Sequence, residues 1–196
     1  MSKANETRLS ILQKSFELIY TKGYQTTSID DIIATTNLTK GAFYYHFKTK
    51  DEMGLAIINE ILVPTMQESL IAKMENSQNP IEDIYAMMKS LLFENPVLQI
   101  QYGCPIGNLT QEMTPWNVEF SHALMNLISE WQDVLQKSIN NAIKNGKIRK
   151  NVDAEQVAIF IVSGYWGIRN LGKIYNNSDC YVAYLKELKI YLENLK

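Results

Sequence analysis

Cysteine is scarce in this sequence, and it shows no ligand-type spacing. The 196 residues contain two cysteines, Cys104 and Cys180, too few for a disulfide scaffold. Neither lies in a CxxC motif or in a Cys/His cluster with metal-ligand spacing. We therefore expect no metal site, no cofactor and a reducing, cytoplasmic location.

Long hydrophobic runs and enzyme motifs are also missing. The N-terminal MSKANETRLS has no apolar core of signal-peptide length, and the longest apolar runs are far shorter than a bilayer span, so we expect a soluble protein with no membrane partner. No GxSxG, HExxH, P-loop or dinucleotide-type glycine motif occurs. The remaining enzymatic alternative pairs Cys104 with His122, which is not a catalytic pattern in a helical chain. We predict that the protein is not an enzyme.

The small negative net charge conceals a basic segment. A formal charge of -2 by itself disfavours nucleic-acid binding, which needs cationic groups. The stretch from residue 32 to residue 50 nevertheless contains no acidic residue. Its basic residues and its histidine are Lys40, His46, Lys48 and Lys50.

Apolar spacing predicts an amphipathic first helix and a short second one. The first is indicated by apolar residues at spacings of three and four, namely Leu9, Leu12, Phe16 and Ile19. Gly23 is expected to end it. Thr27 and Asp30 have the spacing of a capping box for the second helix, which should end at Asn37.

A third short helix completes the N-terminal pattern. Thr39 is expected to cap it, and Phe43 and Phe47 share one of its faces. Two short helices joined by a tight turn behind a packing helix are typical of a helix-turn-helix. We predict a DNA-binding domain over residues 1–50, with the helix-turn-helix at 28–47.

The rest of the chain, residues 51–196, shows helical patterns, no strand alternation and no internal repeat. Pro64 should kink or split the helix over residues 51–74. Asn79-Pro80, Thr114-Pro115 and Asp153 have the sequence of helix starts. The fold class predicted is all-α, with about nine helices, an N-terminal helix-turn-helix domain and a larger C-terminal helical domain.

The third helix has the residue types that major-groove binding requires. Gly41 and Ala42 permit close approach of the backbone, and Lys40 can reach a guanine edge. The residues placed to donate to phosphates are Tyr44, Tyr45, His46, Lys48 and Lys50. Taken singly, the histidine could be an ordinary surface residue and the tyrosines packing aromatics; as a set without a nearby acid they favour DNA.

Two segments resemble a known family. Thr39–Glu52, TKGAFYYHFKTKDE, resembles the TetR-family signature of the third helix and the start of the fourth, and Gly23–Ile32 resembles the family's turn into the second helix. Met53 stands where the family usually has leucine. The resemblance implies that DNA is faced by Thr27, Ser28, Thr39, Lys40, Ala42, Tyr44, Tyr45, His46 and Lys50. It also implies a repressor that binds a palindromic operator as a homodimer and is released by a small-molecule inducer, with residues 51–196 as the ligand-sensing and dimerisation domain. An architectural DNA binder that senses no ligand is the alternative.

The resemblance also suggests a ligand cavity. Gly103–Leu109 resembles a segment that lines the ligand cavity in a subset of the family. The candidate lining residues are Cys104, Met113, Trp116, Phe120, Trp131, Tyr165, Trp166 and Arg169, although such aromatics often only fill cores. Arg169 should pair with an acid such as Glu112 or Glu130, or await an anionic ligand. Cys104 is either a reactive thiol at a helix start or a buried, inert residue.

The last two predicted helices supply a candidate dimer interface. Its residues are Ser163, Gly164, Gly167, Tyr181, Leu185, Leu188 and Leu192, with Leu195 extending the stripe. Two such helices from each chain would form a four-helix interface, as the family also uses. The expectation is that a monomer would leave this stripe in water.

Overall fold

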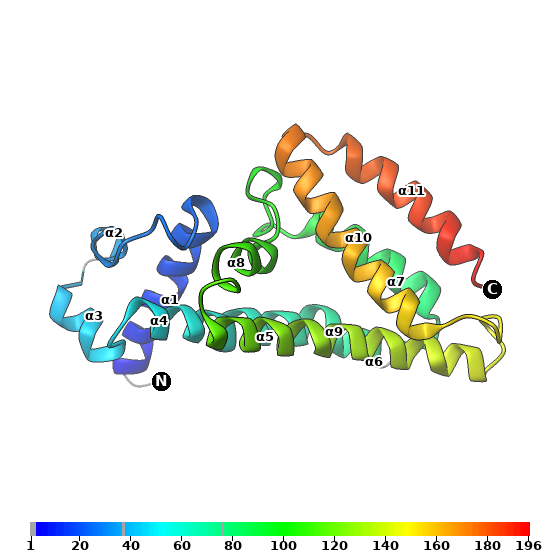
Figure 1. Cartoon of the computed structure of the whole chain (residues 1–196), viewed down its shortest axis with the longest axis horizontal. Coiled ribbons are helices and arrows are strands. Elements are labelled where there is room, and N and C mark those ends of the chain that lie inside the picture. The colour runs from blue at the N-terminus through cyan, green and yellow to red at the C-terminus, as the bar shows by residue number, and fades with distance from the viewer. Residues whose placement is uncertain (1–2, 37, 76) are drawn as a thin grey trace. The chain divides into compact units, whose positions relative to one another are not determined.

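The structure is a computed structural model that describes residues 3–36, 38–75 and 77–196 (Figure 1). Helices form all of its regular structure, and no strand occurs in the described residues, which confirms the all-α prediction. The helices up to the middle of the chain are α1 (Lys3–Lys22), α2 (Ile29–Thr35), α3 (Lys40–His46), α4 (Lys50–Ile57), α5 (Val63–Met66), α6 (Ala72–Glu75) and α7 (Pro80–Lys89). Those that follow are α8 (Pro105–Met113), α9 (Val118–Lys144), α10 (Ala154–Tyr175) and α11 (Asp179–Glu193). Asn37, expected to end the second helix, lies outside the described residues.

Pro64 does not split its helix. Two π-helical turns, η1 (Ile58–Leu62) and η2 (Gln67–Ile71), join α4, α5 and α6 into a continuous helix over Lys50–Glu75. In η1 the amide of Val63 donates to the carbonyl of Ile58, five residues back. This π-turn lies just before Pro64, which has no amide hydrogen to donate. The helix therefore continues past the proline by changing from α-helical to π-helical hydrogen bonds. A third π-turn, η3 (Ser90–Glu94), extends α7.

The helix Lys50–Glu75 is long and apolar enough to cross a membrane, by length and composition alone. The core helix of a soluble protein passes the same test. Met53, Ile57, Leu62, Leu70 and Met74 of this helix are buried within the chain.

The chain forms two compact units. Residues 1–65 and 105–125 make the first, and residues 66–104 and 126–196 make the second. Helix α8 and the start of α9 therefore belong with the helix-turn-helix. The expected functional division at residue 50 remains a prediction.

The first unit has a core formed by several of its helices. Leu12 of α1, Ile32 of α2, Phe43 of α3 and Met53 of α4 are all buried. Gly54 allows a close approach, because a Cβ there would lie 2.6 Å from the Phe120 ring and 2.7 Å from the Tyr24 ring. The absence of a side chain at this position lets α4 meet the start of α9.

Helix boundaries follow capping chemistry. Gly23 ends α1 with a φ of +97°, and Asp153 caps α10, as predicted. The prediction for Thr114-Pro115 is wrong. The Thr114 hydroxyl donates to the carbonyl of Thr110, at the end of α8, and the Asn117 side chain accepts from the amides of Glu119 and Phe120 at the start of α9.

Candidate nucleic-acid interface

Helix α2 starts one residue later than the sequence pattern suggested. Ser28 is its N-cap: the hydroxyl accepts from the amide of Asp31 at 3.0 Å, and the Asp31 carboxylate accepts from the amide of Ser28 at 2.8 Å. Hydrogen bonds from Ser28 lower the pKa of Asp31. Thr27, expected to be the cap and to face DNA, is buried instead, and its hydroxyl donates to the carbonyl of Gly23 at 2.6 Å. Of these two predicted DNA contacts, only Ser28 is at the surface.

Helix α3 has one buried and one exposed face. Thr39 caps it, with the hydroxyl accepting from the amide of Ala42 at 3.2 Å, as predicted. Phe43 and Phe47 are 1% and 0% exposed, so they anchor the helix on the core. Tyr45 is 78% exposed and Tyr44 45%. Two neighbouring tyrosines are therefore exposed to solvent on a helix whose other face is buried. Such a pair of exposed aromatic side chains is uncommon, and it is accessible to a binding partner.

Lys40 pairs with an acid that lies ten residues before it. Its ammonium lies 2.9 Å from the Asp30 carboxylate, and this contact raises the pKa of Lys40. Both side chains are exposed, so the pair contributes little to stability and can open for another anion. Gly41 beside it is exposed, and a Cβ there would make only an ordinary contact with the Thr39 hydroxyl at 3.8 Å.

Lys50 has a structural role that the sequence did not indicate. Its ammonium donates to the carbonyls of Tyr24 at 3.0 Å and Thr27 at 3.1 Å, and it lies 4.5 Å from the centre of the Tyr24 ring. The ammonium of Lys50, which was predicted to bind a phosphate, therefore points toward the segment that connects α1 and α2. Lys48, by contrast, has an exposed side chain, and His46 is half-buried.

The residues predicted to line one ligand cavity are distributed over both units. Met113, Trp116 and Phe120 are in the first; Cys104, Trp131, Tyr165, Trp166 and Arg169 are in the second. Trp116 is 81% exposed, so its assignment to an enclosed cavity is wrong. Phe120 packs edge-on against Tyr24 at 5.2 Å in the core of the first unit. Trp131 and Tyr165 form a buried edge-to-face pair, and Cys104 is buried too, which favours the inert alternative for its thiol.

Arg169 is fully buried and bonds to backbone carbonyls. Its guanidinium donates to the carbonyls of Leu98, Gln99 and Gly103 and faces the Tyr181 ring. Glu112 instead accepts from the amide of Gln25 at 2.9 Å, and Glu130 accepts from Gln67. The sequence did not reveal this, because carbonyl acceptors have no signature in the side chains.

Comparisons with known proteins agree with this geometry. The family model described as "Bacterial regulatory proteins, tetR family" matches residues 11–57, and that described as "Tetracyclin repressor-like, C-terminal domain" matches residues 80–188. A regulator from Lactococcus lactis, named as an uncharacterized HTH-type transcriptional regulator in the lacX 3' region, is 30% identical over 158 residues, 81% of this chain and 80% of that protein. The chain belongs to the TetR family of transcriptional regulators. It is a DNA-binding regulator and not an enzyme.

Other TetR-family proteins extend the likeness over nearly the whole chain. The repressor DhaR of Mycobacterium sp. (strain GP1) is 24% identical over 176 residues, covering 88% of this chain and 85% of its own. A TetR regulator from Chloroflexus aurantiacus has a solved structure with a TM-score of 0.88 and 27% identity, covering 98% of this chain and 97% of its own.

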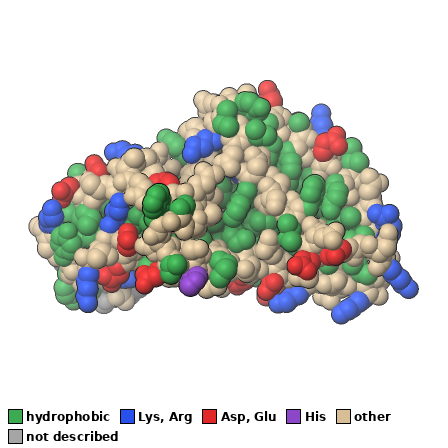
Figure 2. Space-filling model, in the orientation of Figure 1, with side chains coloured by type: hydrophobic (Ala, Val, Ile, Leu, Met, Phe, Trp, Pro, Cys, Tyr) green, Lys and Arg blue, Asp and Glu red, His purple; other side chains and the backbone are tan. Residues whose placement is uncertain are grey.

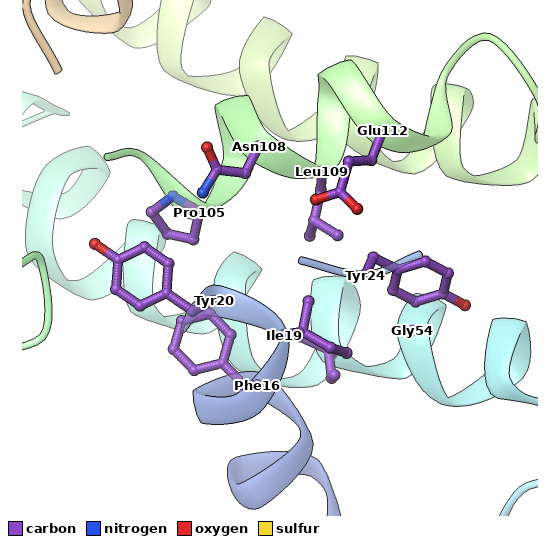
Figure 3. A pocket seen from close by; sticks show the side chains of 10 residues that line it. Phe16, Ile19, Tyr20, Tyr24, Gly54, Pro105, Asn108, Leu109 and Glu112 are labelled. Carbon is purple, nitrogen blue, oxygen red and sulfur yellow. The ribbon is translucent and has the colours of Figure 1, made fainter. Parts of the chain in front are cut away.

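In this TetR-family chain, α8 packs directly on the helix-turn-helix unit. Figure 3 shows Pro105, Asn108 and Leu109 of α8 facing Phe16 and Tyr20 of α1. The space between them is about 10 Å³, room for about one water molecule. At the other end of the helix, Glu112 holds the amide of Gln25, so α8 is bonded to the α1–α2 connection.

The predicted dimer stripe of this TetR-family chain is buried within a single chain. Tyr181, Leu185, Leu188, Leu192 and Leu195 are each less than a tenth exposed, so the expectation that a monomer would leave them in water is wrong. Helix α11 packs on α7 and α10 and buries the stripe there. A Cβ on Gly164 would meet Tyr184 at 2.5 Å, so this glycine also serves packing inside the chain.

A different apolar face of α10 and α11 is exposed. Its members are Ile159, Phe160, Leu171, Ile174, Tyr175, Val182 and Ile190. Ser163 and Gly167 of α10 are exposed as well, and a Cβ on Gly167 would meet nothing within 4 Å. Figure 2 shows hydrophobic side chains at the surface in the region of these helices. Exposed apolar side chains on neighbouring helices can form an association surface.

Proposed function

We propose that this TetR-family chain is a repressor that binds a palindromic operator through α3 as a homodimer and is released by a small-molecule inducer. The observation that carries the proposal is the exposed face of α3. Tyr44 and Tyr45 are exposed to solvent there, while Phe43 and Phe47 of the same segment are buried. The sequence from residue 32 to residue 50 contains no acid, and the carboxylate that pairs with Lys40 of α3, that of Asp30, is exposed. Such a protein works in the cytoplasm, where its operator is.

The DNA contact is tested with duplexes that the wild-type chain selects from a random-sequence library. Tyr45→Ala should weaken gel-shift affinity for the selected duplex by about tenfold, since phosphate donors at the edge of a groove are lost. Trp116→Ala is the matched control, because it removes an equally exposed aromatic from the same unit outside α3. Equal effects of the two substitutions would overturn the assignment to α3.

The proposed dimer uses the exposed face of α10 and α11 in place of the buried stripe. Ser163 and Gly167 of the predicted interface stay in this proposal, because both are exposed. Ile174→Glu should yield folded monomers in sedimentation velocity, since Ile174 is 74% exposed and its replacement leaves the core intact. Met125→Glu, at another exposed apolar position, should leave the dimer unchanged. A dimeric Ile174→Glu variant would exclude this face.

Response to a ligand is supported by hydrogen bonds at both ends of residues 103–112, which include α8. Arg169 holds the carbonyl of Gly103, two residues before α8, and Glu112 on α8 holds the amide of Gln25. A displacement of α8 would therefore reach the connection that leads into the helix-turn-helix. A metabolite screen tests this: an inducer should raise the melting temperature and lower operator affinity together. If no compound in a broad screen does both, the ligand-independent architectural alternative is favoured.

A further inference from the structure

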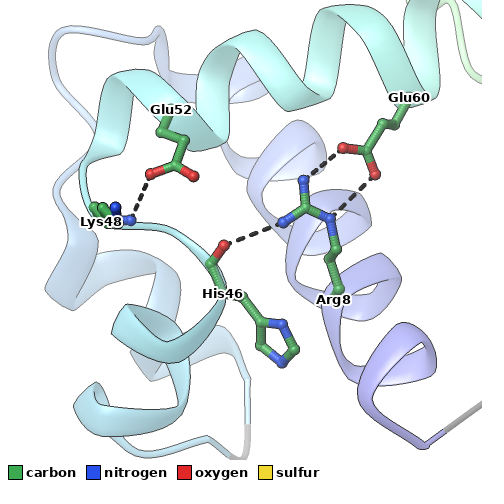
Figure 4. Close-up of polar contacts among 5 residues, drawn as sticks. All are labelled: Arg8, His46, Lys48, Glu52 and Glu60. Carbon is green, nitrogen blue, oxygen red and sulfur yellow. Dashed lines mark hydrogen bonds and ion pairs between the residues drawn. The ribbon is translucent and has the colours of Figure 1, made fainter.

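Arg8 is a partly exposed cation of the first unit whose guanidinium is bonded by the protein itself. Its guanidinium forms a two-pronged contact with the Glu60 carboxylate, Nε to Oε2 at 3.2 Å and Nη2 to Oε1 at 2.5 Å (Figure 4). Glu60 lies in η1, so this contact joins α1 to the long helix. The fork matches the planar shape of both groups and fixes the direction of the guanidinium.

The third nitrogen of Arg8 reaches the end of α3. Nη1 donates to the carbonyl of His46 at 3.1 Å, and the guanidinium lies 4.3 Å from the centre of the Phe47 ring. His46 is the last residue of α3, and carbonyls at a helix C-terminus have no amide partner within the helix. A cation there satisfies one of them and also interacts favourably with the helix dipole.

A second contact, between Glu52 and Lys48, stabilises the turn that follows α3. The Glu52 carboxylate accepts from the amide of Lys48 at 2.7 Å, at the point where the chain turns from α3 into α4 (Figure 4). Helix α3 has only seven residues, so few contacts set its direction besides its buried anchors Phe43 and Phe47. Thr39 fixes its first turn, and Arg8 with Glu52 fixes its end.

We infer that Arg8, oriented by Glu60, is a positioning residue that sets the direction of α3 for DNA binding, and not one of the phosphate contacts. The inference rests on the proposed function of α3. An arginine near the N-terminus of a DNA-binding unit would ordinarily be assigned to phosphate. Here each of its three nitrogens already has a protein acceptor, and one of these acceptors lies on the helix to be positioned.

The sign of the Glu60→Gln effect separates the two roles. If Arg8 gripped phosphate, removal of its carboxylate would free the guanidinium and raise operator affinity. If Arg8 positions α3, the same substitution loosens the guanidinium and lowers the affinity. We expect Glu60→Gln and Arg8→Gln each to weaken binding of the selected duplex by about tenfold. The slope of log affinity against log salt should stay unchanged in both variants, whereas loss of a phosphate contact would reduce it by about one.

Lys14→Gln and Glu17→Gln are the matched controls, because they break an exposed ion pair on the same helix α1 at 2.9 Å. Both should leave operator affinity within about twofold of wild type. Tighter binding by Glu60→Gln, or a shallower salt slope in Arg8→Gln, would overturn the inference.

A second readout needs no DNA. Amide hydrogen exchange at residues 45–48 should quicken in Arg8→Gln and Glu60→Gln and stay at the wild-type rate in the two controls, because the end of α3 loses its tether. Unchanged exchange there would also overturn the inference. If the wild-type chain selects no duplex, the proposed function fails, and the exchange rates still decide whether Arg8 fixes α3.

Discussion

At the scale of the residue, charged groups that a sequence assigns to DNA can be engaged by the chain itself. Lys50 and Lys48 are two residues apart and equally cationic, but one ammonium bonds two carbonyls while the other is in water. Burial of Thr27 makes the same point for a hydroxyl. Residue type and spacing predicted an interface on α3. They could not distinguish side-chain donors that face solvent from donors that bond to backbone carbonyls of the same chain.

Lys50→Met should lower the free energy of unfolding by about 1–3 kcal/mol, since the carbonyls of Tyr24 and Thr27 lose a charged donor. The salt slope of operator binding should not change. Lys48→Met is the matched control. It should leave the urea midpoint of unfolding unchanged and reduce the salt slope of operator binding by about one. A reduced slope in Lys50→Met would restore its predicted role as a phosphate contact.

Two glycines should respond oppositely to alanine. Gly54→Ala places a Cβ 2.6 Å from the Phe120 ring and should destabilise the protein by about 1–3 kcal/mol. Gly41→Ala meets only the Thr39 hydroxyl at 3.8 Å and should stabilise α3 by about 0.5–1 kcal/mol. Thermal unfolding of the two variants measures this, and a neutral Gly54→Ala would show that Phe120 can move aside.

At the scale of the element, helix ends were predicted well where the cap has a local signature. Thr39, Gly23 and Asp153 lie where the pattern placed them. The start of α9 was missed because the Thr114 hydroxyl bonds back to the Thr110 carbonyl of α8, and Asn117 caps α9 instead. Hydrophobic periodicity identified the stripe on α11, but apolar spacing does not say whether the surface it meets belongs to the same chain or to a partner.

The capping box of α2 should make stability depend on acid. The pKa of Asp31 is lowered in the folded state, so its contribution is present above its unfolded pKa, about 4, and is lost as the pH falls through the folded value. Asp31→Asn should therefore show a smaller loss of stability between neutral pH and pH of about 2 than the wild type. Urea unfolding at both pH values measures it, and equal losses would contradict the role of the box.

The buried stripe gives a prediction that separates folding from association. Leu188→Glu and Leu192→Glu place a carboxylate at positions 2% and 0% exposed, at a cost of about 4–5 kcal/mol, comparable with the whole stability of many domains. We expect loss of cooperative unfolding in circular dichroism, in contrast to the folded monomer expected of Ile174→Glu. A folded Leu188→Glu monomer would return the stripe to the dimer interface.

At the scale of the whole molecule, the motifs that resemble the family lie in the N-terminal part of the chain, and the packing of the larger C-terminal part has no comparable motif in the sequence. The segment TKGAFYYHFKTKDE, together with Gly23–Ile32, indicated the family that the comparisons show. The cavity residues could not be predicted, because aromatic composition is the same for a filled core and for a ligand site. The membership of α8 in the first compact unit depends on contacts far apart in sequence, such as Glu112 with Gln25.

Hydroxyl-radical footprinting of the selected duplex tests the central claim, that two copies of α3 read one operator. The wild-type chain should protect two half-sites related by a two-fold axis, with centres about 34–36 Å apart or a little more. Tyr44→Ala should weaken both half-sites equally, and Ile174→Glu should abolish the paired pattern. A single protected site with the wild-type chain, or full protection by Tyr44→Ala at wild-type concentrations, would contradict the account.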